Sequence, residues 1–469
     1  MAAIVRNSFR IRNIRNFINS LIGDPPSNYL FMGIGRPQVW PSGDTPINPK
    51  NNVDSVNSDW DDLIAVKKID PVTNLRFGVL KEVYKPNVKY DMYRHDWNGS
   101  IPQQYNGNNP VVSSGSNPTS LAEVKYHVIN ADSGDVYICL KNGAGSGNAV
   151  STISPWTGTN LEVSGADLGI RECSDGYIWK FVGNTSSSDV DKFSTGLFHP
   201  VKSLTTSVSI GDPYKPQWDV GTACQSHKGG IFAVLVSGGG SGYTVGTHTL
   251  NIKGNGTNCA GTVTVSSGGV VTNVRITNPG SGYTFAAIEN PAGGSSATFD
   301  IIYSQSSGFV DAPDILNATY MMVATQVSSD NDPKFPTENE YRKISLILNP
   351  KSYSNLNLLF SQEMGYATYF VAGAATPNDG VYDSGAGKGL VVNSVTTPSA
   401  GKRMIRPKYT YNTSESPNYS ELSSASASIT SSSPPEVALY EGEIVYSEYR
   451  SQIARALNQT EEIKIVIEM

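Results

Sequence analysis

The spacing of apolar side chains along the 469-residue chain predicts one helix near the start and many short strands after it. Within residues 8–22, apolar side chains recur at steps of three and four, as on one face of a helix. These side chains are Phe9, Ile14, Phe17, Ile18, Leu21 and Ile22. We expect Asn7 or Ser8 to cap this helix, and the Gly-Asp-Pro-Pro sequence at 23–26 to end it.

Compact apolar runs rich in β-branched and aromatic residues predict the strands. The clearest runs are 29–35, 136–140, 177–182, 320–324, 343–348, 441–446 and 462–467. We therefore expect a mainly β, multi-domain protein. Its short antiparallel strands should form sandwich-like domains, accompanied by one N-terminal helix.

Residues 231–303 differ from both flanks because they are dominated by Gly, Ser, Thr and Val. The sequence Gly-Ser-Gly-Tyr-Thr occurs at 240–244 and again at 280–284, forty residues later. Glycine supplies the backbone conformations of tight turns, and each tyrosine adds one large apolar surface. The repeat predicts a Gly-rich β module inserted in a larger domain.

These shifts in composition predict the domain organisation. Residues 1–100 and 315–469 are expected to form a terminal core domain built from both chain ends. The other segments are an inserted β domain at 101–230, the repeat insertion at 231–303 and a Ser-rich loop or linker at 412–435. We expect the helix at 8–22 to cover the last strand, because its apolar stripe can bury Ile463, Ile465 and Ile467; the arginine-rich start and the acidic end of the chain attract weakly and mainly fix the register.

Composition and charge exclude several classes of protein. Charged residues are only 16% of the chain, which contains 45 Gly and 27 Pro, so a coiled coil, a helical repeat array and a charge-driven disordered chain are excluded. The net charge of -6 argues against a nucleic-acid binder, which needs a basic face. No apolar run approaches the ~18 residues needed to cross a membrane.

The start of the chain and the cysteines indicate where the protein is made. Arg6, Arg10, Arg12 and Arg15 stand where a signal peptide would need an apolar run. Four cysteines in 469 residues are too few for a disulfide framework. We expect synthesis in a cytoplasm, with reduced thiols.

One cluster has the residue types of a metal site. Cys224, His227, His248 and Cys259 offer two thiols and two imidazoles, which are ligands that zinc prefers. Their order and spacing are uncommon for such a site, and Gly-rich loops hold ligands poorly. We expect no bound metal, although the sequence leaves open whether these four side chains meet.

The remaining motifs do not meet the requirements of catalysis. Gly385–Gly389 resembles a phosphate loop, but it lacks the earlier glycine and the following Ser or Thr, and Gly33-x-Gly35 lacks a third glycine. The neighbouring carboxylates Asp61-Asp62 and Glu461-Glu462 would point to opposite faces of a strand. We therefore predict no catalytic, cofactor-binding or metal-binding residue and no enzymatic activity.

A set of aromatic and arginine landmarks nevertheless forms an ordered series along the chain. It consists of Phe9-Arg10, 16–20, 31–36 leading to Trp40, 94–97, 175–180, 341–350, 442–446 and 458–465. In this order the landmarks resemble the baseplate wedge subunit of contractile-tailed bacteriophages, the family that forms a dimer within the wedge. Relative to that family, 231–303 and 351–435 are insertions.

The resemblance implies a structural virion protein of the tail baseplate, synthesised in the host cytoplasm. It implies a homodimer that binds other baseplate wedge proteins, and neither nucleic acid nor membrane. It also implies a part in the rearrangement that triggers sheath contraction. Tyr177, Trp179 and Trp97 are expected to pack in cores, whereas Arg36 either faces a partner or braces the loop at Trp40.

Two other functions stay open. A tail-fibre or tailspike adhesin that binds host-surface glycans would also suit Gly-rich β repeats, but a solenoid needs at least about three copies and this chain has two. A secreted β-rich binding protein is disfavoured by the lack of a signal peptide.

Overall fold

The computed structural model describes residues 5, 7–22, 25–36, 40, 43, 45–49, 59–60, 63–71, 75–81, 127–130, 133–141, 155–195, 198–204, 206–304, 319–328, 341–353, 362–364, 368–372, 381–383, 389–399, 402–409, 428–433, 436–438, 440–453 and 460–468. These residues form antiparallel sheets and an N-terminal helix, α1 (Asn7–Ile22). The prediction of a mainly β, multi-domain chain with one N-terminal helix is therefore confirmed.

The chain divides into two compact units, each assembled from distant segments. One unit contains 1–15, 76–322 and 466–469, and the other contains 16–75 and 323–465. One four-stranded sheet has the order β28-β17-β3-β9; its strands are Thr460–Glu468, Tyr320–Ser328, Leu75–Lys81 and Phe198–His199. The domain boundaries expected from composition stay a prediction.

In the second unit, a five-stranded sheet has the order β20-β2-β1-β18-β27. Its strands are Gln362–Met364, Leu63–Lys68, Leu30–Gly35, Tyr341–Leu348 and Glu443–Ile453, and the short strands β19 (Lys351–Ser352) and β26 (Val437–Ala438) pair beside it. Every residue of β1 and β18 is buried. This explains the continuous apolar run of β1, since a strand covered on both faces needs no polar side; β18 is mainly apolar only from Ile344 onward and also buries Arg342 and Lys343.

The other sheet of this unit has the order β22-β23-β24-β21-β25. Its strands are Val381–Asp383, Gly389–Ser399, Lys402–Tyr409, Thr368–Ala372 and Ser428–Ser433. The last of these lies inside the Ser-rich segment 412–435 that was expected to be a loop or linker, so that expectation does not hold for residues 428–433. Composition alone missed the strand, because its backbone hydrogen bonds come from pairing with β21, about sixty residues earlier.

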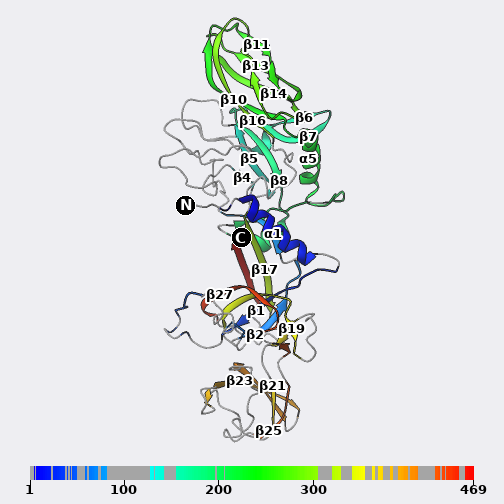
Figure 1. The fold of residues 1–469 in the computed structure, drawn as a ribbon, viewed down its shortest axis with the longest axis vertical. Helices are drawn as coiled ribbons and strands as arrows, with labels where there is room; N and C mark the ends of the chain where they lie inside the picture. Colours follow the sequence, from blue (N-terminus) through cyan, green and yellow to red (C-terminus); the bar gives the residue numbers. More distant parts are fainter. Residues whose placement is uncertain are drawn as a thin grey trace. The chain divides into compact units, whose positions relative to one another are not determined.

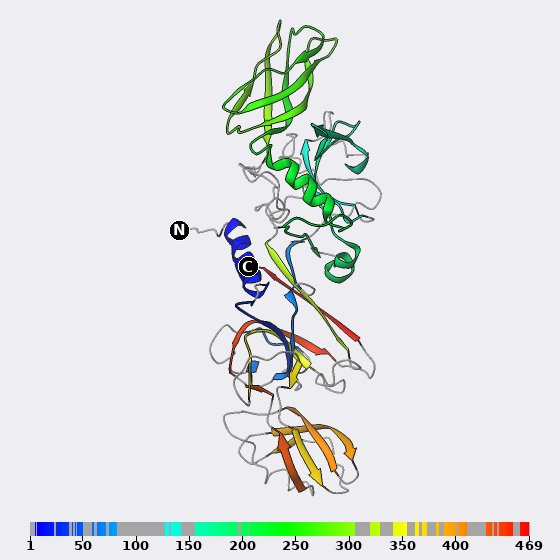
Figure 2. The ribbon, with the colours of Figure 1, turned by 90° about the vertical axis from the view of Figure 1, so that its right-hand side faces the viewer.

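The first unit contains a sheet in the order β4-β5-β8-β7-β6. Its strands are His127–Ile129, Val136–Lys141, Ile178–Gly183, Ala166–Glu172 and Thr159–Val163. Helix α5 (Lys215–Gln225) packs against β7 and β8 (Figure 2), while α4 (Ser187–Phe193) and a short 3-10 turn, η2 (Pro155–Thr157), lie in the connections. Tyr177 and Trp179 stack at 5.7 Å inside the core, as predicted; Trp97 lies outside the described residues.

The Gly-rich module also belongs to the first unit and appears in green in Figure 1. Its strands are β10 (Ile231–Ser241), β11 (Gly246–Thr249), β12 (Ile252–Gly254), β13 (Thr257–Val265), β14 (Val271–Ser281), β15 (Ala286–Ile288) and β16 (Ser295–Tyr303). Strand β10 pairs with β16, β13 with β14, and β12 with β15. Phe232, Ala233 and Ile302 extend into the core of the neighbouring sheet β4–β8, so the base of the module is part of that core.

Helix α1 spans the predicted segment but buries a different face. Its buried side chains, Ile11, Ile14, Ile18 and Leu21, follow steps of three, four and three. Phe9 is exposed because it projects to the opposite side, and Ile22 is exposed at the last turn, so the expected stripe was wrong at both residues. At the other end of the chain, Glu468 accepts a hydrogen bond from Arg10 at 2.5 Å, and the first helix and last strand are therefore in contact.

Candidate interaction sites

The two copies of the repeat close the module by reaching across to one another. The amide of Tyr243, in the first copy, donates to the carbonyl of Gly269 at 3.1 Å; forty residues later, the amide of Tyr283 donates to Gly229 at 2.9 Å. Gly229 and Gly269 both have a φ near +66°, a conformation that favours glycine. The tyrosine loop of each copy is thus seated on the start of the other. Two copies therefore complete a core, unlike an open solenoid.

Each tyrosine ring lies against a glycine. A Cβ atom built on Gly294 would come within 2.4 Å of the Tyr243 ring, and one on Gly256 within 2.3 Å of the Tyr283 ring. Both rings are buried in the core of the module. The Tyr243 hydroxyl also donates to Oδ1 of Asn290 and accepts from the amide of Ala297, each at 2.9 Å. The repeat therefore builds a rigid, self-closed module.

Three of the four residues considered as metal ligands have separate hydrogen-bond partners. The ring of His227 contacts the carbonyl of Gly280 at 3.0 Å, and that of His248 contacts the carbonyl of Thr244 at 2.7 Å. The Cys224 thiol donates to the carbonyl of Leu168 at 3.4 Å, and burial raises its pKa. Burial also raises the pKa of Cys259 to about 12, so the thiolate that binds metals is disfavoured. Among the described residues, no three His, Cys, Asp or Glu side chains form a metal cluster.

The other candidate motifs have structural positions where they are described. Gly33 lies in β1, where a Cβ atom would come within 2.9 Å of Leu63, so this glycine permits close strand packing. Glu461 is buried and accepts from the Tyr341 hydroxyl at 3.2 Å, whereas Glu462 is exposed. They lie on opposite faces of β28, as the strand period predicts. Asp61-Asp62 and residues 385–388 lie outside the described residues.

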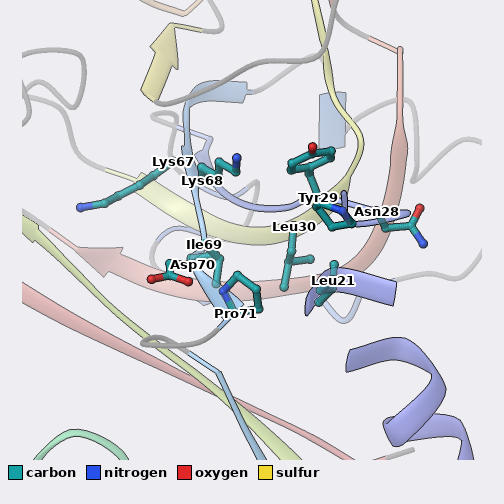
Figure 3. A pocket seen from close by; sticks show the side chains of 10 residues that line it. Leu21, Asn28, Tyr29, Leu30, Lys67, Lys68, Ile69, Asp70 and Pro71 are labelled. Carbon is teal, nitrogen blue, oxygen red and sulfur yellow. The ribbon is translucent and has the colours of Figure 1, made fainter. Parts of the chain in front are cut away.

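A pocket of about 470 Å³ opens at the start of β1 and the end of β2 in the second unit. Figure 3 shows Leu21, Leu30 and Ile69 on one side, with Tyr29 and Lys68 across from them. The Lys68 amine lies 4.4 Å from the centre of the Tyr29 ring, while Lys67 extends outward and donates to the carbonyl of Gln326 at 2.6 Å. The pocket combines an apolar floor with an aromatic ring and two lysines at its rim, and the carboxylate of Asp70 also lines it.

Sequence reasoning did not identify this pocket. The dipeptide Lys67-Lys68 at the end of an apolar strand was its only local signal, and a lysine pair at a strand end usually marks solvent exposure. Its floor comes from α1, β1 and the residue after β2, and its rim from the residue before β1 and the end of β2. Only the fold brings these elements together.

Arg36 braces the Trp40 segment. Its guanidinium lies 4.2 Å from the centre of the Trp40 ring, a cation–π geometry. The Trp40 indole donates to the carbonyl of Arg450 at 2.7 Å, and its ring lies 5.0 Å from that of Tyr449. Of the two roles considered for Arg36, the contact with Trp40 is therefore observed.

The comparisons with known proteins show a distant similarity to a phage baseplate protein. No family model matches the chain. It is 26% identical over 201 residues to the protein named baseplate wedge protein gp8 of Enterobacteria phage T4, an alignment that covers 38% of this chain and 54% of that protein. The chain thus spans about half the length of this relative. In the described part of the chain, no helix has the length and apolarity needed to cross a membrane.

Proposed function

We propose that this protein is a structural component of a bacteriophage tail baseplate wedge, located in the virion. The similarity to a baseplate wedge protein carries the proposal. Rigid sheets, a self-closed module and a low content of charged residues suit a part that must hold its shape while gripping neighbours. We further propose that it acts as a homodimer, binds other wedge proteins, and participates in the rearrangement that triggers sheath contraction.

The pocket at Tyr29 supports one contact with a neighbouring wedge protein. Its apolar floor fits one large apolar side chain, and the Lys68 amine at its rim fits a carboxylate beside that side chain. We propose that an apolar residue flanked by Asp or Glu, from another wedge protein, occupies it. Such a ligand buries apolar area and pairs with a rim charge at the same time.

Reconstitution with the other wedge proteins of the same phage tests the proposal. Lys68→Glu reverses the rim charge and is expected to weaken binding at least tenfold, as measured by titration against the purified partner. Lys253→Glu is the matched control, because Lys253 is an exposed lysine of the Gly-rich module; it should bind like the wild type. If both variants bind normally, the pocket is not the contact.

Localisation and oligomeric state test the wider proposal independently of the pocket. Antibody label on virions is expected at the baseplate ring, and light scattering of the purified chain is expected to give the mass of a dimer. Label at the fibre tips would instead support the adhesin. A monomer at all micromolar concentrations would contradict the homodimer.

A further inference from the structure

Two oppositely charged side chains lie together inside the second unit. Lys343 stands in β18, opposite Gly35 of β1 on one side and Tyr449 of β27 on the other. Its amine lies 3.0 Å from Oδ1 of Asp59, and the two side chains are only 3% and 6% exposed. Charged groups are rarely buried so completely unless they are paired.

Both carboxylate oxygens of Asp59 are held in place. The Ser447 hydroxyl donates to Oδ2 at 2.5 Å, and the Tyr449 hydroxyl donates to Oδ1 at 2.9 Å. The Tyr449 ring lies 5.0 Å from the Lys343 amine and 5.0 Å from the Trp40 ring. The amine and the carboxyl group are therefore fixed against each other beside the Tyr449 ring.

We propose that Lys343 and Asp59 join covalently as an intramolecular amide bond. In the first step one proton passes from the ammonium to the carboxylate across their 3.0 Å contact, which gives the neutral amine that can act as a nucleophile and a carboxylic acid. Nζ of Lys343 then bonds to Cγ of Asp59, and the Cγ–Oδ2 bond breaks. Oδ2 leaves as water with the acid's proton and one proton from the amine, so no oxidant or cofactor is needed.

The neighbouring hydroxyls are placed to assist this condensation. Tyr449 donates to Oδ1, the oxygen that becomes negative when the amine adds to Cγ, and such a donor stabilises the intermediate. Ser447 contacts Oδ2, the leaving oxygen, and can relay the proton to it. The fold holds the amine and the carboxyl group 3.0 Å apart. Two groups held this close within one site react much faster than the same groups on separate molecules.

The bond would tie β18 to the segment that precedes β2, across 284 residues of chain. It concerns the interior of one unit and does not depend on the proposed place in the baseplate. An internal amide bond would keep this part of the unit joined under a force that unfolds the rest of the chain.

Mass spectrometry of the denatured full-length protein tests the proposal directly. We expect the intact mass to be lower than the sequence mass by one water. Trypsin should release peptide 51–67 joined to peptide 343–351, because an amide on Lys343 blocks cleavage after it. The exposed pair Lys253–Glu289, 3.6 Å apart, is an internal control and should stay unlinked.

Two variants assign the bond to these residues. Asp59→Ala and Lys343→Met should each give the full sequence mass, whether or not they fold, because the measurement uses denatured protein. The intact mass and the tryptic peptides of the wild-type protein decide the proposal without the variants. An intact mass equal to the sequence mass, together with release of the unlinked peptide 344–351, overturns the proposal.

Discussion

Two sheets of this protein each bury a lysine within a strand, and they accommodate it differently. Lys343 in β18 meets the carboxylate of Asp59. Lys180 in β8 is fully buried; its amine donates to the carbonyl of Phe181 at 2.6 Å and lies beside the Cys224 thiol. The nearby Asp167 carboxylate already accepts two hydrogen bonds from Arg171, both at 2.8 Å. One lysine is therefore held by an acid, whereas burial lowers the pKa of the other and favours its neutral form.

The difference predicts which lysine depends on its partner. Asp59→Ala leaves Lys343 buried without its carboxylate and also removes the acceptor of Ser447 and Tyr449. We expect it to lower the free energy of unfolding of the second unit by about 3–5 kcal/mol, because it leaves a buried amine without a partner; this holds whether the wild type keeps the two groups as an ion pair or joins them as the proposed amide. Urea denaturation followed by tryptophan fluorescence measures this loss.

The exposed pair Lys253–Glu289 supplies the control for this variant. Glu289→Ala should change stability by less than about 1 kcal/mol, because solvent screens an exposed pair. Equal effects of Asp59→Ala and Glu289→Ala would show that the buried pair adds nothing beyond a surface contact.

Neither lysine environment could be predicted from the sequence. The runs around Lys180 and Lys343 predict strands correctly, but a lysine in a strand usually marks a solvated face. Burial of Lys343 depends on Asp59, far away in the chain, and on two neighbouring strands. A local pattern contains none of this information.

The Gly-rich module shows what a local pattern does contain. Its forty-residue repeat predicted two similar β units, and the structure has them with matching glycines at 229 and 269. The exchange of tyrosine loops between the copies was not predicted, because it depends on how the strands are ordered. The pocket at Tyr29 was missed for the same reason, since three separate elements line it.

The second prediction concerns replacement of each buried amine. Lys180→Met keeps the volume of the side chain and removes a costly polar group, so we expect stability to be unchanged or raised by up to about 2 kcal/mol. Lys343→Met removes the partner of Asp59 and should destabilise the second unit. Urea denaturation measures the free energy of unfolding of the two variants. A loss of more than about 2 kcal/mol for Lys180→Met would show that Lys180, like Lys343, depends on its contacts.

The smallest expected effect is a dependence of stability on pH. Because burial lowers the pKa of Lys180, the unfolded chain binds more protons than the folded chain between that lowered value and the ordinary lysine pKa of about 10.4. The free energy of unfolding should therefore rise with pH in this window, by at most about 1.4 kcal/mol per pH unit. As the pH falls toward the lowered pKa, that stability is lost.

Other groups limit where this slope can be measured. Burial raises the pKa of Cys224, so above about pH 8.5 the unfolded thiol loses its proton first and stability falls. Urea denaturation at about pH 7.5–8.5 keeps clear of this range and also of the ordinary histidine pKa of about 6.5. Burial also lowers the pKa of Lys141, whose amine donates to Asn273, and that contribution stays in every variant. Lys180→Met should therefore reduce the slope of the free energy of unfolding against pH without abolishing it. Identical slopes in the variant and the wild type would show that Lys180 is charged in the folded protein.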